Sequence, residues 1–445
     1  MSLTSYRQKI KSLSDQLVAI QRPIMILDAI KWPRELQQQF IDNDGRELPA
    51  IDSRYYDQYR FNFDPDAKRQ ELKQLKRSIV KNLGKNDALG NILRHTVDQY
   101  LIVIDMLQQR GKPGFMPLSQ KLYGSARDRL RGDRKSIIEL GENLCHIFSL
   151  PAAAHLARPY PKKLSAQEAV NSLQSRLSTY FNDSGFNVIL SDGIVSDASA
   201  GGDSIKINSN ARFSELDIKV LEVHEGWVHV GSTLNGRSQP WATWLSVGSP
   251  RITATQEGLA IIMETLTFSS FPNRARRISD RVVAIDMAEQ GADFIQVYRH
   301  FVDAGLSEHD SYIIAQRTFR GGDVKGGACF TKDLSYVKGF VETVNFIRSA
   351  ILSGVPEILP MLFVGKVTLD DLPSLYEHTL EGLIKPPAFL PPMFRDLNGL
   401  YTWFGFSSGM TLVDLGRVKR HFEKLFATLP VASPIMPAEQ DVEFD

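Results

Sequence analysis

Apolar residues recur at helical spacing through most of the chain, so the pattern predicts a mainly helical protein. Ile10, Leu13, Leu17 and Ile20 share one stripe of a helix over residues 5–20. The same spacing predicts helices over 86–110, 134–149, 165–181, 257–268, 275–290, 293–304, 308–319 and 333–352, short helices within 356–385, and a closing amphipathic helix over 411–428. Residues 41–70 are polar, with Pro65 among them, and predict loops and short turns.

The periodicity changes between residues 186 and 208, where short runs of β-type residues alternate with glycines. The runs cover 186–192, 194–198 and 203–208. We therefore expect an α+β fold, mostly α-helical, with a small β-sheet just before the helix that starts near Ser214. Ile205 to Asn208 is the expected edge strand, and Asn208 is the residue there that we expect to contact a ligand.

Connector-like sequence at 155–165 (HLARPYPKKLS) divides the chain into two expected regions. Residues 1–155 form an N-terminal helical region that packs on the second region, residues 156–430. Residues 431–445 carry prolines and then acidic residues, and we expect a disordered tail.

Composition narrows the class of protein. The 445 residues are 43% hydrophobic and 23% charged, with a formal net charge of +1. This balance is ordinary for a globular protein and gives no global attraction to nucleic acid or to a membrane. No apolar run reaches membrane-spanning length, and the polar N-terminus lacks a signal core. Cys145 and Cys329 are too few for a disulfide framework, so we expect a cytoplasmic protein.

The most informative motif is HEGWVH at residues 224–229, in which two histidines flank a glutamate. The common zinc-peptidase motif places its histidines at i and i+4 on one helical face. His224 and His229 are one residue further apart, which in a regular α-helix turns them about 140° away from each other. A π-bulge would remove the excess residue, and Gly226 could ease the distortion. The alternative is a helix with two partly buried histidines.

A zinc peptidase needs three protein ligands and an open position for water. Glu257 follows the motif, and the capping-box spacing of Thr253 and Gln256 predicts that it lies in a first helical turn. The expected ligands are His224, His229 and Glu257, with Glu264 as the next candidate for the third. Glu225, beside the first histidine, would act as general base.

Other catalytic roles have weaker candidates. Tyr336 follows a glycine-rich loop over 320–333 and could stabilise an oxyanion, although a core tyrosine fits equally well. Arg320 is the candidate cation for a substrate carboxylate, and Arg237 or Lys332 could replace it. The loop is either mobile over the site or a plain connection.

The HEGWVH string, QEGLA at 256–260 and the glycine-rich stretch at 318–339 resemble a known family. These are the bacterial flavohaemoglobin expression-modulating QEGLA motif proteins, whose animal relatives include the microtubule-associated tyrosine carboxypeptidase. The resemblance implies a zincin-like zinc metallopeptidase with an HExxxH motif and a downstream glutamate ligand. We accordingly expect a carboxypeptidase acting on the C-terminus of a polypeptide. Hydrolysis of a non-peptide amide and a non-catalytic regulatory role remain alternatives, and the sequence leaves the oligomeric state open.

Overall fold

The computed structural model describes residues 3–156, 160–181, 185–192, 194, 196–202 and 204–427, and it is mostly helical. None of the helices in these ranges combines the length and apolar character needed to cross a membrane. The predicted tail at 431–445 lies outside the described residues. Short helices connect the larger elements: α2 (Ile26–Ala29), α3 (Glu35–Asp42), α4 (Ser53–Asp57), α7 (Phe115–Tyr123), α8 (Ile137–Phe148), α9 (Pro151–Leu156), α18 (Leu372–Leu380) and α19 (Pro392–Arg395).

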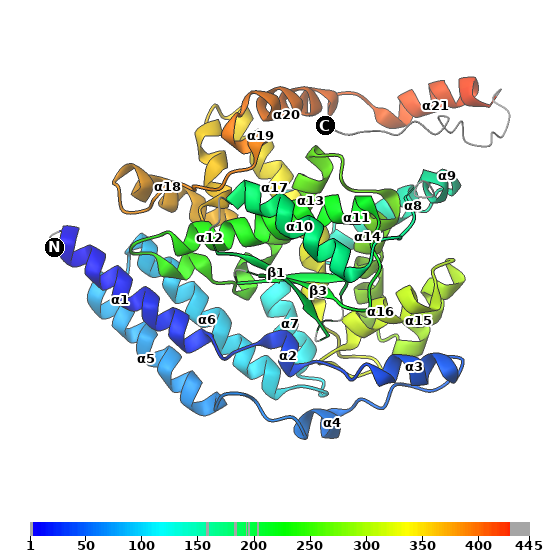
Figure 1. Cartoon of the computed structure of the whole chain (residues 1–445), viewed down its shortest axis with the longest axis horizontal. Helices are drawn as coiled ribbons and strands as arrows, with labels where there is room; N and C mark the ends of the chain where they lie inside the picture. Colours follow the sequence, from blue (N-terminus) through cyan, green and yellow to red (C-terminus); the bar gives the residue numbers. More distant parts are fainter. Residues whose placement is uncertain are drawn as a thin grey trace.

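Three long N-terminal helices pack side by side: α1 (Leu3–Gln21), α5 (Pro65–Leu83) and α6 (Ala88–Gln108) (Figure 1). The predictions for α1 and α6 are confirmed, whereas the loop prediction is wrong from Pro65 onward. Asp64 accepts hydrogen bonds from the backbone of residues 66 and 67, and the proline stands at the first helical position. The proline that suggested a loop therefore starts α5.

The small sheet has three strands, β1 (Asn187–Ser191), β2 (Ala198–Gly201) and β3 (Ser204–Asn208), in the order β1-β3-β2. β3 runs parallel to β1 and antiparallel to β2. It is therefore the central strand, and the expectation that Ile205 to Asn208 forms an edge is wrong. The edge strand beside the HEGWVH segment is β2, which starts where the predicted second run ends. Figure 1 shows β1 and the central β3 beneath α10 and α11.

Two apolar cores hold these elements together. The smaller core joins α10 (Ala166–Phe181), the sheet and α11 (Glu215–Leu221), with Leu173, Ile205 and Ile218 fully buried. The larger core takes residues from Ile10 through Phe404 and so draws on both sides of position 155. The division at 155 stays a prediction, while the α+β, mostly helical class is confirmed.

Of the helices that follow the sheet, α12 (Gly231–Arg237) and α13 (Thr253–Leu266) contact the HEGWVH segment. The chain continues with α14 (Pro272–Glu289), α15 (Phe294–Asp303), α16 (Glu308–Phe319) and α17 (Leu334–Leu352). The tightest crossing joins α13 and α17. A Cβ on Gly258 would collide with the backbone of Gly339, and one on Gly339 with the carbonyl of Ala254. Glycine at both positions lets the two helices touch, which brings the region of Glu257 next to that of Tyr336.

The C-terminal helices α20 (Asn398–Met410) and α21 (Leu415–Phe426) follow each other along one edge of the molecule (Figure 1). α20 packs on α17 through buried Leu400 and Phe404. α21 is the predicted closing helix, but none of its residues is buried.

Candidate metal centre

The HEGWVH segment does not form a regular α-helix. Between α11 and α12, residues Glu222–Val230 form a π-helical stretch with i→i+5 geometry. This is the deformation that the five-residue spacing requires, and it places the ring centroids of His224 and His229 4.9 Å apart. Gly226 has a further, steric role, because a Cβ there would collide with the buried side chain of Leu177 in α10.

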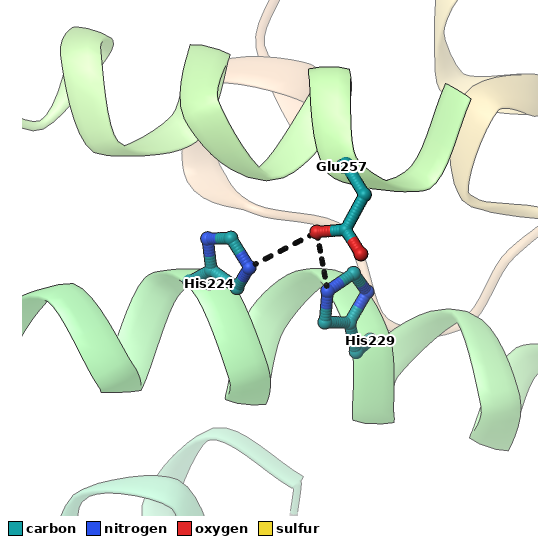
Figure 2. Close-up of side chains that lie close together, drawn as sticks. All are labelled: His224, His229 and Glu257. Carbon is teal, nitrogen blue, oxygen red and sulfur yellow. Dashed lines mark ion pairs between the residues drawn. The ribbon is translucent and has the colours of Figure 1, made fainter. Parts of the chain in front are cut away.

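Glu257 approaches the two histidines from the neighbouring helix α13 (Figure 2). Its Oε2 atom lies 3.5 Å from Nε2 of His224 and 3.7 Å from Nε2 of His229. One ligand atom from each of the three residues lies within 4.8 Å of the others. The ligand atoms of a tetrahedral zinc site are about 3.4 Å apart, so this separation fits a shared ion.

The local start of α13 differs from the predicted one. The helix begins at Thr253 without a side-chain cap, so the predicted capping box is wrong and Glu257 lies in the second turn. Gln256 instead contacts the motif helix, with its Oε1 atom 3.4 Å from Nδ1 of His229. Lys366 donates to that same oxygen at 2.9 Å and to the carbonyl of His229 at 2.8 Å. Burial lowers the pKa of Lys366 to about 8, against the opposing charges of Glu257 and Glu225.

His224 is fixed by a buried carboxylate on its other ring nitrogen. Its Nδ1 atom lies 2.6 Å from Oε1 of Glu264, which in turn accepts two hydrogen bonds of 2.6 and 2.7 Å from Arg274. Burial alone would raise the pKa of Glu264, but the charge of Arg274 and its hydrogen bonds lower it to about 2. When an ion displaces the proton of Nε2, an ionised Glu264 keeps the remaining ring proton on Nδ1 and leaves the Nε2 lone pair for the ion. Glu264 thus contacts the far ring nitrogen of His224, and Glu257 is the carboxylate that faces both histidines.

Burial and neighbouring charges shift the pKa values of His224 and Glu257. Burial disfavours the charged form of His224, yet the nearby carboxylates of Glu257 and Glu264 raise its pKa to about 10. Burial likewise opposes ionisation of Glu257, but Lys332 and the two histidines hold its pKa well below the ordinary value. Its Oε2 atom is buried and has no hydrogen-bond partner. A buried, ionised oxygen without a partner is costly unless a positive charge meets it.

Glu225 points to the sheet. Its Oε2 atom accepts a 2.7 Å hydrogen bond from the backbone N–H of Ala200 in β2. The edge strand and the motif helix are therefore joined at the residue that the sequence predicts as general base.

The second carboxylate oxygen of Glu257, Oε1, faces a group of cations rather than the histidines. Lys332 is 3.5 Å from Oε1 of Glu257 and also lies over the ring of Tyr336, where Arg281 approaches to 4.8 Å from the ring centroid. Tyr336 is half-buried between these cations, next to the proposed metal ligands.

Two arginines in this group pair with one carboxylate, that of Asp333, and a third arginine lies nearby. Arg317 binds this carboxylate at 2.6 and 2.9 Å, Arg281 lies 3.7 Å from it, and Arg320 stacks on Phe330. The Nε atoms of Arg281 and Arg320 are buried without a hydrogen-bond partner. Burial, together with the charge of Arg317, lowers the pKa of Arg281 and lowers that of Arg320 to about 10. The group, here called the arginine cluster (Arg281, Arg317 and Arg320), has more positive charge than Asp333 neutralises.

Other sequence candidates lie elsewhere. The side-chain amide of Asn208 donates to the carbonyl of Ile194 and accepts from the backbone of Asn210. Arg237 lies in α12, next to Gly202 rather than in the arginine cluster. The glycine-rich loop is mostly buried, and its Gly321 exchanges hydrogen bonds with Tyr56 and Gly111, which favours a plain structural connection over a cover for the site.

Sequence patterns did not single out Arg274, Arg281, Arg317 or Lys366. These four cations come from α14, α16 and the segment before α18, and no spacing relates them to the motif. Lys332 was an alternative candidate for the substrate carboxylate. Gln256 was noted only for its capping-box spacing and its place in the QEGLA string.

Comparison with known proteins identifies a family that matches most of the chain. A family model described as microtubule-associated tyrosine carboxypeptidase matches residues 38–411, which is most of the sequence and includes every residue of the candidate site. The description of this family does not mention the QEGLA motif, so the relation to the QEGLA motif proteins stays a resemblance. The comparison with curated proteins gives no match.

Proposed function

The chain belongs to the microtubule-associated tyrosine carboxypeptidase family, and on that premise we propose that it is a zinc-dependent carboxypeptidase. The observation that carries the proposal is the convergence of His224, His229 and Glu257 across a π-helical turn. The buried Oε2 atom of Glu257 faces both rings and has no hydrogen-bond partner. Two imidazoles and one carboxylate are a common protein ligand set of catalytic zinc.

His224, His229 and Glu257 would hold the ion. When bound, zinc would supply a Lewis acid for the scissile carbonyl and make the attacking water more acidic. Glu264 fixes the tautomer of His224, and Gln256 contacts the ring of His229 while being held by Lys366. These contacts keep both rings oriented before an ion arrives.

Glu225 would take the proton from the attacking water and return it to the leaving amine. The N–H of Ala200 holds one of its oxygens, and the second has no hydrogen bond to the described residues. A carboxylate fixed at one oxygen keeps its direction while the other exchanges the proton. Tyr336, beside Arg281 and Lys332, would donate to the oxygen of the scissile carbonyl.

The polypeptide substrate would lie along β2. This strand pairs with β3 on one side, and its other side faces the motif helix through Ala200. An extended peptide can add to such an edge through main-chain hydrogen bonds. β2 thereby replaces the Ile205–Asn208 segment as the proposed substrate strand.

The arginine cluster would bind the free terminal carboxylate of the substrate. Arg281 and Arg320 each have a buried Nε atom without a hydrogen-bond partner, whereas Arg317 is hydrogen-bonded to Asp333. The contact of Arg281 with Asp333 is a longer ion pair of 3.7 Å. Arginine presents paired donors that match a carboxylate. This proposal keeps Arg320, the candidate from sequence, and adds Arg281.

The test compares matched peptides with free and amidated C-termini, cleaved by zinc-loaded protein and read by mass spectrometry. The amidated peptide leaves the cluster without its anion, so we expect kcat/KM to fall at least about 30-fold. Arg281→Met should lower kcat/KM for the peptide with a free C-terminus. The ratio of kcat/KM between the free and the amidated peptide should therefore become smaller. Arg131→Met, at an exposed arginine paired with Asp370, is the matched control and should change neither.

Two results would contradict the proposal. Equal cleavage of both peptides, or products from internal bonds, would make the protein an endopeptidase. Absence of any cleavage across a peptide library by zinc-loaded protein would favour a non-peptide amide substrate or a binding role.

A further inference from the structure

The C-terminal edge of the molecule carries an uncovered apolar surface. In α20, Trp403, Phe406 and Met410 follow one another at i, i+3 and i+7, so they share a helical face. Trp403 is 57% exposed and Phe406 73% exposed, although α20 itself is anchored on the body by Leu400 and Phe404. Leu412 and Val413, in the turn that follows, are exposed as well.

The next helix, α21, continues this surface. Leu415, Val418, Phe422, Leu425 and Phe426 recur at helical spacing and form one stripe along it. None of these side chains is buried, and Leu415, Leu425, Phe426 and Phe422 are between 46% and 74% exposed. We call the stretch from Trp403 to Phe426 the C-terminal stripe.

Charges on α21 have a distinct arrangement. Arg417, Arg420 and Lys424 project from the side of the helix opposite the apolar residues. Lys419 and Glu423 lie at the margin of the stripe, where they form an ion pair of 3.5 Å. The stripe is thus apolar at its centre, with one positive and one negative residue at its edge.

The exposed apolar area is large for a single chain. A fully exposed aromatic side chain offers about 200 Å². Trp403, Phe406, Phe422 and Phe426 are between 46% and 73% exposed, so these four alone leave on the order of 450 Å² in contact with water. The exposed leucines and Met410 add a comparable amount. The total is above the roughly 300–600 Å² of the largest patch on a typical monomer and near the 800 Å² that each partner of a standard interface buries.

We propose that the C-terminal stripe binds the same stripe of a second copy of this chain, forming a symmetric dimer. An antiparallel pairing of two α21 helices brings apolar residues together and sets Lys419 of each copy near Glu423 of the other. Arg417, Arg420 and Lys424 stay on the outside, so like charges do not meet. The family match ends at residue 411, before α21 begins. The larger part of this surface therefore lies beyond what the family shares.

The charges at the margin of the stripe favour a second copy over a lipid surface. Basic residues on the polar face and aromatic residues on the other also occur in helices that lie on membranes, so Arg417, Arg420 and Lys424 do not decide between the two. The marginal Lys419 and Glu423 instead make the stripe complementary to itself.

The test measures the mass of the full chain by sedimentation velocity over a wide concentration range. Wild-type protein should be a dimer at micromolar concentration. Phe406→Asp and Phe422→Asp each place a charge at an already exposed position, so folding is preserved while the dimer dissociation constant rises at least about 30-fold. Arg420→Ala, on the opposite side of α21, is the control and should leave the dimer intact. A monomeric wild type, or a dimer that both aspartate variants retain, would overturn the proposal.

A charge-exchange experiment tests the pairing itself. Lys419→Glu places two acidic residues at the margin, and Glu423→Lys places two basic ones, so each variant alone should dimerise more weakly than wild type. A mixture of the two should form a heterodimer in preference to either homodimer, and the double exchange should restore dimerisation. Heterodimers no more abundant than random mixing would refute the antiparallel contact. Flotation of the wild type with anionic vesicles, lost in Phe422→Asp, would reassign the stripe to a membrane.

Discussion

The contact between His224 and Glu264 gives the most specific prediction about the metal centre. Glu264 is fully buried, and Glu264→Gln keeps its size while removing its charge. The hydrogen bond from Nδ1 of His224 would then reach a neutral oxygen, and the preference for the required tautomer would weaken. Loss of such an outer partner lowers metal affinity 10- to 100-fold, or about 1.4–2.8 kcal/mol.

The same change affects the stability of the metal-free protein, because Arg274 loses its carboxylate partner. Breaking a buried pair by removing one charge costs about 3–5 kcal/mol. The side chain of Arg274 is 23% exposed, so we expect the loss to lie near the lower end, about 3 kcal/mol. Zinc affinity is measured by competition with a chromogenic chelator, and stability by urea unfolding of the metal-free form.

Glu222→Gln is the matched control. Glu222 lies in the same π-helical stretch but pairs with Arg176 at the surface, so the change should cost at most about 1 kcal/mol of stability and no zinc affinity. A folded Glu264→Gln protein that binds zinc within twofold of wild type would refute the role assigned to Glu264.

Three further predictions concern the base, the packing of the motif and the buried charges. Glu225→Gln should retain zinc and lower kcat about 10²- to 10⁴-fold, and near-normal turnover would remove Glu225 from the mechanism. Gly226→Ala should lower the free energy of unfolding by about 1–3 kcal/mol because of the collision with Leu177, and by less in a Leu177→Ala background; equal costs in urea titrations of both backgrounds would contradict this. Asp333→Asn should cost about 3 kcal/mol near pH 7, because it leaves Arg317 buried without a carboxylate. Burial opposes ionisation of Asp333, but Arg317 and Arg281 hold its pKa below the ordinary value, so its stabilisation is complete above about pH 4 and is lost as the pH falls further. Unfolding curves should show the wild-type advantage shrinking below that pH, and a constant difference would be evidence against the assignment.

Local spacing was enough to predict the centre of the site. The five-residue interval between His224 and His229 demands a widened helical turn if both rings are to meet, and the chain forms one. The helical repeats of α10 and α13 to α17 were likewise readable, because each buries one apolar face. Local patterns gave a wrong prediction where one residue type is common in two kinds of structure. Proline occurs both in loops and at the first position of helices, and Pro65 starts a helix where a loop was expected.

Contacts between distant segments could not be read from the sequence. The position of β3 between β1 and β2 depends on how the strands pair, which their composition does not encode. The arginine cluster combines α14 with α16, and its carboxylate Asp333 precedes α17. Such charges look like an ordinary solvated helix surface until the helices are packed. Glu264 was expected as a possible ligand, whereas packing directs it to the far side of His224.

The zinc content of purified protein tests the central claim most directly. Elemental analysis of wild type, His224→Ala, His229→Ala and Glu257→Ala, each confirmed to be folded, should give about one zinc per wild-type chain and loss of tight binding in every variant. Undiminished zinc in Glu257→Ala would place the third ligand elsewhere. A folded wild-type chain that takes up no zinc would contradict the account.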